Sequence, residues 1–222
     1  IEALATKKIG MSREEIIEET KLGNSGDLSS KLEELEYCGF IRKYNYFGSK
    51  KKNSLYQLCD FFSLFYYQFL VKEPDDNNFW SNQINTTAVN TWKGLAFERV
   101  CMNHVNQIKN KLGISGVLTQ TNSWFCKKDL DNGIYGSQID LLIVRKDQII
   151  NLCEMKYSDN EYSINEKTSK SIKNKISDLK TVTKTKYAIH PTLLTTYGLL
   201  DNAYANEIQS VITLDDLFKI IE

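Results

Sequence analysis

Two neighbouring segments in the second half of the chain are apolar enough to be buried β-strands. Residues 139–144 and 149–155 are rich in isoleucine, leucine and valine, and the polar residues 146–148 separate them. Two β-prone runs around so short a polar segment predict a β-hairpin with a three-residue loop. Because both alternating faces of these strands are largely apolar, we expect the hairpin to be covered on both sides.

The register of this hairpin brings charged residues together at one end. A three-residue loop pairs Val144 with Ile150 and places Asp140 opposite Glu154. Since side chains alternate between the two faces of a strand, Asp140, Glu154 and Lys156 share one face. Charged groups on a buried face are costly unless they are paired or bind a metal. This end of the hairpin is therefore the first candidate for a functional site.

Helical periodicity is found on both sides of the hairpin. Between residues 94 and 113, apolar residues recur at i, i+3 and i+4 and predict a long amphipathic helix with Glu98 beside its apolar stripe. A second helix is predicted within 161–180, with lysines on the face opposite its apolar residues. The apolar residues are Ile172, Ile176 and Leu179, and the lysines are Lys170, Lys173, Lys175 and Lys180. Short strands are expected at 116–120, 123–126, 187–189, 192–196 and 211–212, before a final helix capped by Thr213.

Residues 1–58 predict a small helical domain that ends in a β-wing. Ser12, with Glu15 three residues later, has the capping-box pattern of a helix start. Ser25 or Asp27 is expected to cap a second helix. Strands are predicted at 40–44 and 54–58. Helix, turn, helix and a basic hairpin is the element order of a winged-helix domain.

The tip of the predicted wing carries three consecutive lysines, Lys50, Lys51 and Lys52. In a winged helix the second helix of the pair enters the major groove of DNA and the wing contacts the backbone. These lysines are therefore candidates for nucleic-acid binding, although a lysine run in a turn is also typical of a solvated loop. The second helix carries the acidic residues Glu33, Glu34 and Glu36, which weaken the DNA-binding interpretation.

Residues 59–93 form a connector with many aromatic side chains. Its aromatic residues recur at helical spacing, and we expect them to pack between domains rather than to bind a cofactor. They are Phe61, Phe62, Phe65, Tyr66 and Phe69.

The composition excludes a global attraction to nucleic acid. Among 222 residues, 28 Lys and Arg balance 28 Asp and Glu, so nucleic-acid binding requires a local basic patch. The five cysteines include no Cys-x-x-Cys pair, which favours buried reduced thiols over a disulfide framework or a zinc site. No signal peptide is visible and the longest apolar run is too short to cross a bilayer. We therefore expect a cytoplasmic protein without a membrane partner.

The charged residues of the hairpin have the donor types that a hard divalent cation prefers. Asp140 and Glu154, with a backbone carbonyl, would suit Mg²⁺, which keeps several of its own waters. Such an ion polarises a phosphodiester and lowers the pKa of a bound water, and Lys156 would orient that water or stabilise the developing charge. Glu98 would bind the metal or hold Lys156. The alternative is a buried ion network of Asp, Lys and Glu that specifies strand pairing only.

These residues, together with motifs elsewhere, resemble a known family. Asp140, Glu154-x-Lys156 and the preceding helical Glu98 are similar to the core of the PD-(D/E)XK nuclease superfamily, although Ile139 stands where its Pro would be. A closer resemblance is to the DUF234 C-terminal region of archaeal-type P-loop ATPases, which a winged helix precedes. It is carried by the segments Trp92-Lys93-Gly94-Leu95-Ala96-Phe97-Glu98, 60–69, Thr195-Thr196-Tyr197-Gly198 and Thr213-Leu214-Asp215-Asp216-Leu217-Phe218.

The resemblance implies an α/β protein with a winged helix at 1–58, a connector at 59–93 and a restriction-endonuclease-like mixed sheet flanked by helices at 94–222. It implies a nuclease-like domain that binds DNA and cleaves phosphodiesters with Mg²⁺, or else a non-catalytic regulatory or protein-interaction module. The helix around Lys173 would contact backbone phosphate. An ATPase module would precede this chain, which begins without Met and which we take as a fragment. No Gly-x-x-x-x-Gly-Lys-[Ser/Thr] motif occurs, so no ATPase activity is expected here.

Overall fold

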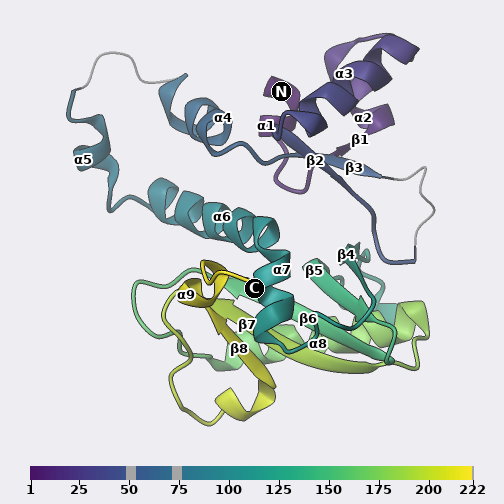
Figure 1. Cartoon of the computed structure of the whole chain (residues 1–222), viewed down its shortest axis with the longest axis vertical. Coiled ribbons are helices and arrows are strands. Elements are labelled where there is room, and N and C mark those ends of the chain that lie inside the picture. Colours follow the sequence, from purple (N-terminus) through teal and green to yellow (C-terminus); the bar gives the residue numbers. More distant parts are fainter. Residues whose placement is uncertain (49–53, 72–76, 222) are drawn as a thin grey trace. The chain divides into compact units, whose positions relative to one another are not determined.

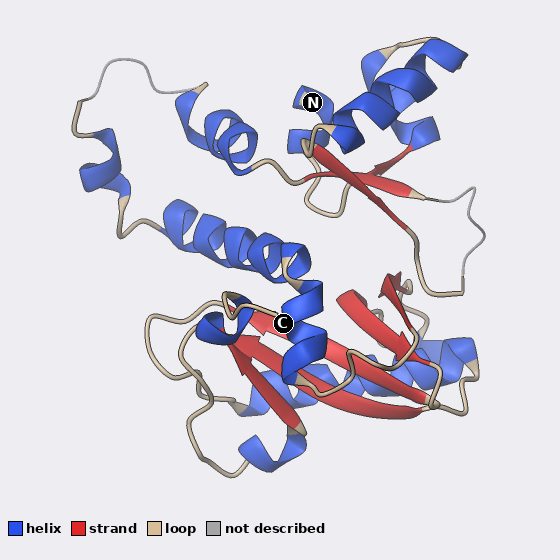
Figure 2. Cartoon of the chain, viewed as in Figure 1, coloured by secondary structure: helices blue, strands red, loops and turns tan. Residues whose placement is uncertain are grey.

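The computed structural model describes residues 1–48, 54–71 and 77–221 and divides the chain into two compact units. The first unit is Ile1–Thr86 and the second is Thr87–Glu222. Both are mixtures of helices and strands (Figures 1 and 2). None of the described helices is long and apolar enough to span a membrane.

The first unit has the element order expected of a winged helix. Its elements up to residue 58 are α1 (Glu2–Ala5), β1 (Met11–Ser12), α2 (Arg13–Thr20), α3 (Gly26–Tyr37), β2 (Ile41–Tyr44) and β3 (Leu55–Leu58). The strands form an antiparallel sheet in the order β1-β3-β2. Apolar side chains from the helices and strands form one core: Leu4, Met11, Ile16, Leu28, Leu32, Ile41 and Leu58. Lys50, Lys51 and Lys52 lie outside the described residues.

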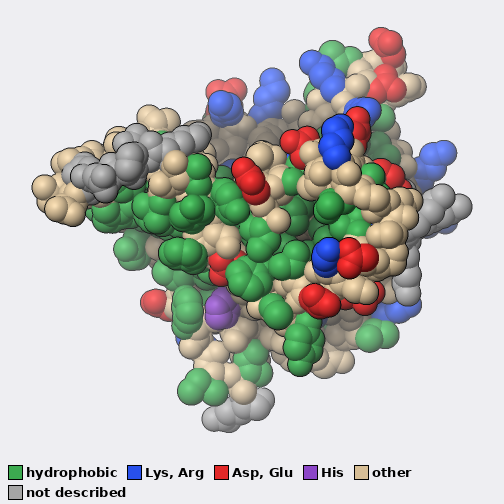
Figure 3. Space-filling view, turned by 90° about the horizontal axis from the view of Figure 1, so that it is seen from above, with side chains coloured by type: hydrophobic (Ala, Val, Ile, Leu, Met, Phe, Trp, Pro, Cys, Tyr) green, Lys and Arg blue, Asp and Glu red, His purple; other side chains and the backbone are tan. Residues whose placement is uncertain are grey.

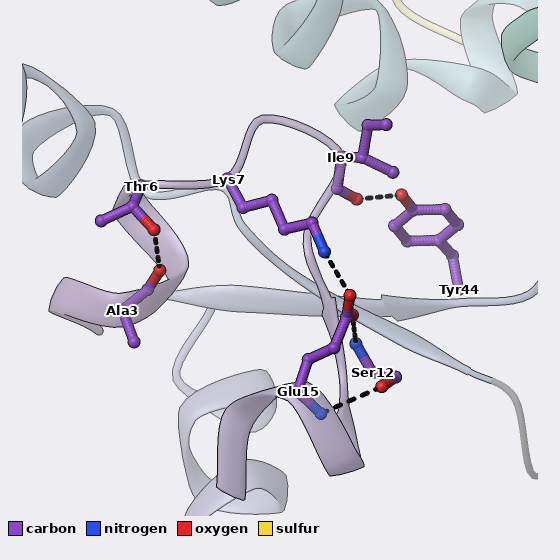
Figure 4. A network of polar contacts seen from close by, with 7 residues as sticks. All are labelled: Ala3, Thr6, Lys7, Ile9, Ser12, Glu15 and Tyr44. Carbon is purple, nitrogen blue, oxygen red and sulfur yellow. Dashed lines mark hydrogen bonds and ion pairs between the residues drawn. The ribbon is translucent and has the colours of Figure 1, made fainter. Parts of the chain in front are cut away.

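The start of α2 confirms the predicted capping box (Figure 4). The Ser12 hydroxyl accepts the backbone N–H of Glu15 at 3.2 Å, and the Glu15 carboxylate accepts the N–H of Ser12 at 2.8 Å. Lys7 pairs with the same carboxylate, and its proximity lowers the pKa of Glu15. The Tyr44 hydroxyl donates to the carbonyl of Ile9, which ties β2 to the segment before β1.

Replacing the capping side chain is expected to weaken α2. In Ser12→Ala the N–H of Glu15 loses its acceptor, and we expect the free energy of unfolding of this unit to fall by about 1 kcal/mol. Ser30→Ala, at an exposed interior position of α3, is the matched control and should not destabilise the unit. Peptide-level hydrogen exchange of α2 and α3 measures both effects, and unchanged protection of α2 in Ser12→Ala would contradict the capping role.

The rest of the first unit contains the aromatic residues. It comprises α4 (Phe61–Phe65), the π-helix η2 (Tyr66–Leu70) and α5 (Phe79–Gln83). Phe65 and Phe69 both pack against Trp80 of the same unit, with ring centroids 5.4 and 6.2 Å away. Phe62 and Tyr66 stack on each other and are 69% and 42% exposed. The packing of these aromatic residues between domains stays a prediction. Figure 3 shows hydrophobic side chains at the surface beside the residues drawn in grey on its left.

The second unit is built on a five-stranded mixed sheet. Its elements are α6 (Thr87–Asn103), α7 (Val105–Lys111), β4 (Thr119–Phe125), η3 (Leu130–Asn132), β5 (Gln138–Arg145), β6 (Ile149–Lys156), α8 (Glu166–Thr183), β7 (Ala188–Thr195), η4 (Ala205–Glu207), β8 (Ser210–Thr213) and α9 (Leu214–Leu217). The sheet order is β4-β5-β6-β7-β8. The pairs from β4 to β6 are antiparallel and those from β6 to β8 are parallel. The predicted fold class, a mixed sheet flanked by helices, is confirmed.

The central hairpin forms with the predicted register. Val144 pairs with Ile150, and the ladder continues to Leu141 and Cys153. Gln148 closes the loop with a φ of 67°, the left-handed conformation typical of three-residue hairpin loops. Both strands lie at the middle of the sheet, which accounts for their burial on both faces.

Helices cover both faces of this sheet (Figure 1). On one face, α6, α7 and α9 contribute to the largest core, which consists of Phe97, Cys101, Ile108, Ile114, Leu141, Ile143, Cys153, Met155, Leu194, Ile212 and Leu217. On the other face lies α8, whose Ile172 and Leu179 are buried like Leu142 and Leu152 of the hairpin. Because the side chains of the hairpin alternate between the two faces of the sheet, they contribute to two separate packed layers.

Three predicted element boundaries in this unit are wrong. The strands expected at 187–189 and 192–196 are the single strand β7. The helix expected from residue 94 begins at Thr87 and ends at Asn103, and α7 starts after His104, whose φ of −111° and ψ of 31° break the helix. The two strands expected between 116 and 126 are one strand, β4, with a bulge between Asn122 and Trp124. A bulge reverses the alternation of side chains locally, so it looks like a strand break in the sequence.

Candidate functional site

Asp140 and Glu154 lie on adjacent strands at the same end of the hairpin. The ladder pairs Leu141 with Cys153, and extending it by one residue pairs Asp140 with Glu154. Directly opposed side chains on one sheet face are near neighbours. Glu154 is buried, and Asp140 is partly exposed. The predicted pair of carboxylates is thus supported by the observed register.

Two lysines neutralise Glu154 from different directions. The Lys156 ammonium lies 2.8 Å from Glu154 Oε1, and the Lys175 ammonium lies 2.6 Å from Oε2. Burial alone would raise the pKa of Glu154, but the positive charges of Lys175 and Lys156 outweigh it and hold the pKa below its ordinary value. Glu154 is therefore a buried carboxylate that stays ionised at neutral pH.

The charge of Lys156 is stabilised mainly by Glu154. Burial would lower the pKa of Lys156, but the Glu154 carboxylate outweighs this effect and raises it. Glu98 on α6 and Tyr162 add to the rise electrostatically. Glu98, Glu154 and Lys156, which come from α6 and β6, are thereby brought into one electrostatic group.

Lys175 lies on a different face of α8 from the one that the sequence predicted. The sequence interpretation put it on the outer face of α8 with the other lysines, which is wrong because its side chain reaches Glu154. Lys175 lies three residues after Ile172 and four before Leu179, so it shares their inward side. This spacing is the sequence signal that could have placed Lys175 on the inward face of α8. The long aliphatic stem of lysine lets the ammonium cross the apolar layer to reach the carboxylate.

Lys173, the predicted phosphate-binding lysine of α8, points away from this group. Its ammonium lies 2.8 Å from Glu207, and its side chain is 63% exposed. Glu207 also accepts the hydroxyl of Ser169 at 2.8 Å. Lys173 is thus a surface residue with a carboxylate partner and lies outside the group around Glu154.

Asp140 has a neutral partner but no cationic one in the described part of the chain. The Gln138 amide donates to Asp140 Oδ1 at 2.7 Å. No ammonium or guanidinium group of the described residues pairs with it, in contrast to Glu154. The charge of Asp140 is therefore less compensated than that of Glu154.

The residues present suit a divalent cation that keeps several water ligands better than one whose ligands all come from the protein. Asp140 and Glu154 contribute two negative charges and Lys156 and Lys175 two positive charges, and the charge of Glu98 acts on Lys156. Among the described residues no three His, Cys, Asp or Glu side chains converge into a metal-binding group. Two carboxylates are nevertheless enough for Mg²⁺, which keeps several waters in its coordination sphere.

One buried carboxylate was missed in the sequence. Asp178 on α8 is fully buried and accepts the backbone N–H of Tyr135 at 2.8 Å and the hydroxyl of Ser137 at 2.5 Å. The thiol of Cys126 lies 3.7 Å from the same carboxylate. Asp178 therefore fastens the loop between β4 and β5 to α8. Nothing in the local sequence pattern distinguishes it from a solvent-exposed helix residue.

Comparisons with known proteins add little to this description. No family model matches the sequence, and no curated protein is significantly similar to it. Among solved structures, the chain is similar to the crystal structure of a protein of unknown function, AF1548, with 15% sequence identity and a TM-score of 0.35. The matched region covers 53% of this chain and 64% of that chain, which is less than two thirds of its length. The functional argument therefore depends on the side chains of the site.

Proposed function

We propose that the second unit is a nuclease-like domain that binds DNA and cleaves phosphodiesters with Mg²⁺. The observation that carries this proposal is the placement of Asp140, Glu154 and Lys156 at one end of a buried hairpin. Asp140 supports a role beyond strand pairing, because among the described residues its partner is the neutral amide of Gln138 and it forms no ion pair. The resemblance to the DUF234 region supports the further proposal that an ATPase module is a partner of this unit.

Each residue of the site has a role in this proposal. Asp140 and Glu154 would hold the ion, which when bound polarises the phosphodiester and lowers the pKa of a bound water. Lys156 would place a positive charge next to the reacting phosphate, where charge develops during attack. Glu98 would hold Lys156 in place through the electrostatic attraction already noted.

The outer face of α8 supports the DNA-binding part of the proposal. Lysines recur on it at helical spacing, and all of them are exposed: Lys167, Lys170, Lys173, Lys180 and Lys184. Such a row can follow a phosphate backbone, whose binding depends steeply on salt because counterions are released. Binding of DNA by this unit should therefore weaken markedly as the salt concentration rises.

A regulatory, non-catalytic module is the second candidate. It is favoured by the complete pairing of Glu154, since both of its carboxylate oxygens already have a lysine partner. The exposed acidic residues Glu33, Glu34 and Glu36 on α3 also suit a basic protein surface better than DNA. A module of this kind would show no DNA affinity that varies with salt.

Metal titration separates the two candidates. We expect Mg²⁺ and Mn²⁺ to bind to the wild-type chain in calorimetry, with DNA present and absent, and not to Asp140→Ala or Glu154→Ala. Asp147→Ala is the matched control, since this exposed carboxylate of the same hairpin pairs with Arg145. Cleavage of linear and branched DNA in Mg²⁺ should fall by about a hundredfold or more in the two site variants, because the ion supplies most of the charge stabilisation.

The opposite result is equally clear. If the wild-type chain binds neither metal, with or without DNA, and the two site variants are only less stable, the charged group is a structural network. The nuclease proposal would then be abandoned in favour of the regulatory module.

A further inference from the structure

The two lysines on Glu154 are not equivalent. The side chain of Lys175 is 17% exposed and comes from α8, whereas that of Lys156 is 38% exposed and lies at the end of β6. Glu154 is the one carboxylate that pairs with Lys175 among the described residues. Lys156 is also attracted by Glu98 on α6. In ion pairs both lysines share Glu154, so they differ in the greater burial of Lys175 and in the additional attraction of Glu98 on Lys156.

This difference decides which lysine can leave Glu154. A metal ligand must present a free oxygen, and each oxygen of Glu154 has a lysine partner. If Lys175 moved away, its ammonium would be left half-buried without a partner, which is costly. The side chain of Lys156 is the more exposed of the two, so its ammonium can move into solvent or toward a phosphate at less cost. The exchangeable oxygen is thus Oε1, which faces Lys156.

We propose that Lys175 is a positioning residue that anchors Glu154 through Oε2, while Oε1 exchanges Lys156 for the divalent cation. This inference rests on the proposed metal site. With Oε1 given to a cation, Lys156 would be able to place its positive charge beside a phosphate. Lys175 acts through Glu154 and contacts neither metal nor substrate. The site is in this way closed by Lys156 until a cation binds.

Metal affinity tests the division of roles because the two lysines have opposite expected effects. Lys156→Met removes a competitor for Oε1, so Mg²⁺ and Mn²⁺ should bind several-fold more tightly than to the wild-type chain. Lys175→Met removes the group that orients a ligand, which typically lowers metal affinity by about tenfold or more. A simple charge effect would instead make both variants bind more tightly, since each loses one positive charge.

Two controls make the measurement decisive. Lys175→Arg keeps the charge and the hydrogen-bond donors, and it should restore most of the metal affinity lost in Lys175→Met. Lys173→Met, on the outer face of α8, should bind metal like the wild-type chain. Thermal unfolding in EDTA is the second readout, and Lys175→Met should be less stable than Lys156→Met because the anchor is more buried.

The possible failures are distinguishable. If the wild-type chain binds metal and both methionine variants bind it more tightly, the anchoring role of Lys175 is refuted and the proposed metal site stands. If Lys175→Met binds more tightly and Lys156→Met more weakly, the roles of the two lysines are reversed. If neither the wild-type chain nor Lys156→Met binds either metal, the metal site itself is refuted, and the inference fails with it.

Discussion

Gly10→Ala is expected to unfold the sheet of the first unit. Gly10 has a φ of 93°, and a Cβ atom there would lie 2.4 Å from the carbonyl oxygen of Tyr56 on β3. The contact is with backbone, so no side-chain rotation can relieve it. Strain from the positive φ and from the overlap should together cost about 3 to 5 kcal/mol. Because Met11 pairs with Tyr56 one residue later, β1 cannot shift without losing its ladder.

Peptide-level hydrogen exchange on the whole chain is the measurement for this variant. Amides of β1 and β3 should lose most of their protection, while those of the second unit should not change. Gly26→Ala is the matched control, since no heavy atom lies within 4 Å of a Cβ at Gly26, at the start of α3. Wild-type protection of β1 in Gly10→Ala would show that the close approach to β3 is not required.

Asp178→Ala should cause the largest loss of stability in the second unit among changes to polar residues. The substitution leaves the N–H of Tyr135 and the hydroxyl of Ser137 without the acceptor that binds them inside the protein. Burial, with a contribution from Asp178, raises the pKa of Cys126, so the thiol also remains protonated and loses its acceptor. Buried donors without partners cost about 1–3 kcal/mol each, so we expect a loss of about 3 kcal/mol or more.

Urea denaturation followed by tryptophan fluorescence measures this loss through Trp92 and Trp124, which both belong to the second unit. Asp178→Asn keeps the shape and one acceptor oxygen and should lose less stability than Asp178→Ala. Ser177→Ala, at the exposed neighbouring position, should change the free energy of unfolding little. A loss below about 1 kcal/mol in Asp178→Ala would mean that water replaces the carboxylate, contrary to its complete burial.

Asp178 connects the stability of the second unit to the proposed site. Asp178 lies on the same helix as Lys175 but bonds to the loop before β5, whereas Lys175 bonds to β6. The helix α8 is therefore fastened to the sheet by polar contacts at two places, in addition to its apolar residues. A change at Asp178 should reach Glu154 through displacement of α8, and it should lower metal affinity and stability together.

The sequence by itself determined the elements whose signals are local. The capping box of Ser12 and Glu15, the apolar runs of the hairpin and its short polar loop all depend on residues close in the chain. Each pattern reflects a steric or hydrogen-bonding requirement that a few residues satisfy alone. The register that pairs Val144 with Ile150 followed from the loop length and the alternation of side chains, and it placed Asp140 opposite Glu154 before any tertiary contact was known.

Tertiary structure alone decided which distant groups meet these residues. Lys175 reaches Glu154 across 21 positions of the chain, and Asp178 binds Tyr135 across 43. The rotation of α8 about its axis decides both contacts, and so does its position along the sheet, which is determined by packing against several strands at once. Helical periodicity identifies the apolar side of such a helix, but it does not identify the strand residue that each of its polar side chains will contact. The anchored carboxylate and the exchangeable lysine are therefore properties of the folded sheet and helix together.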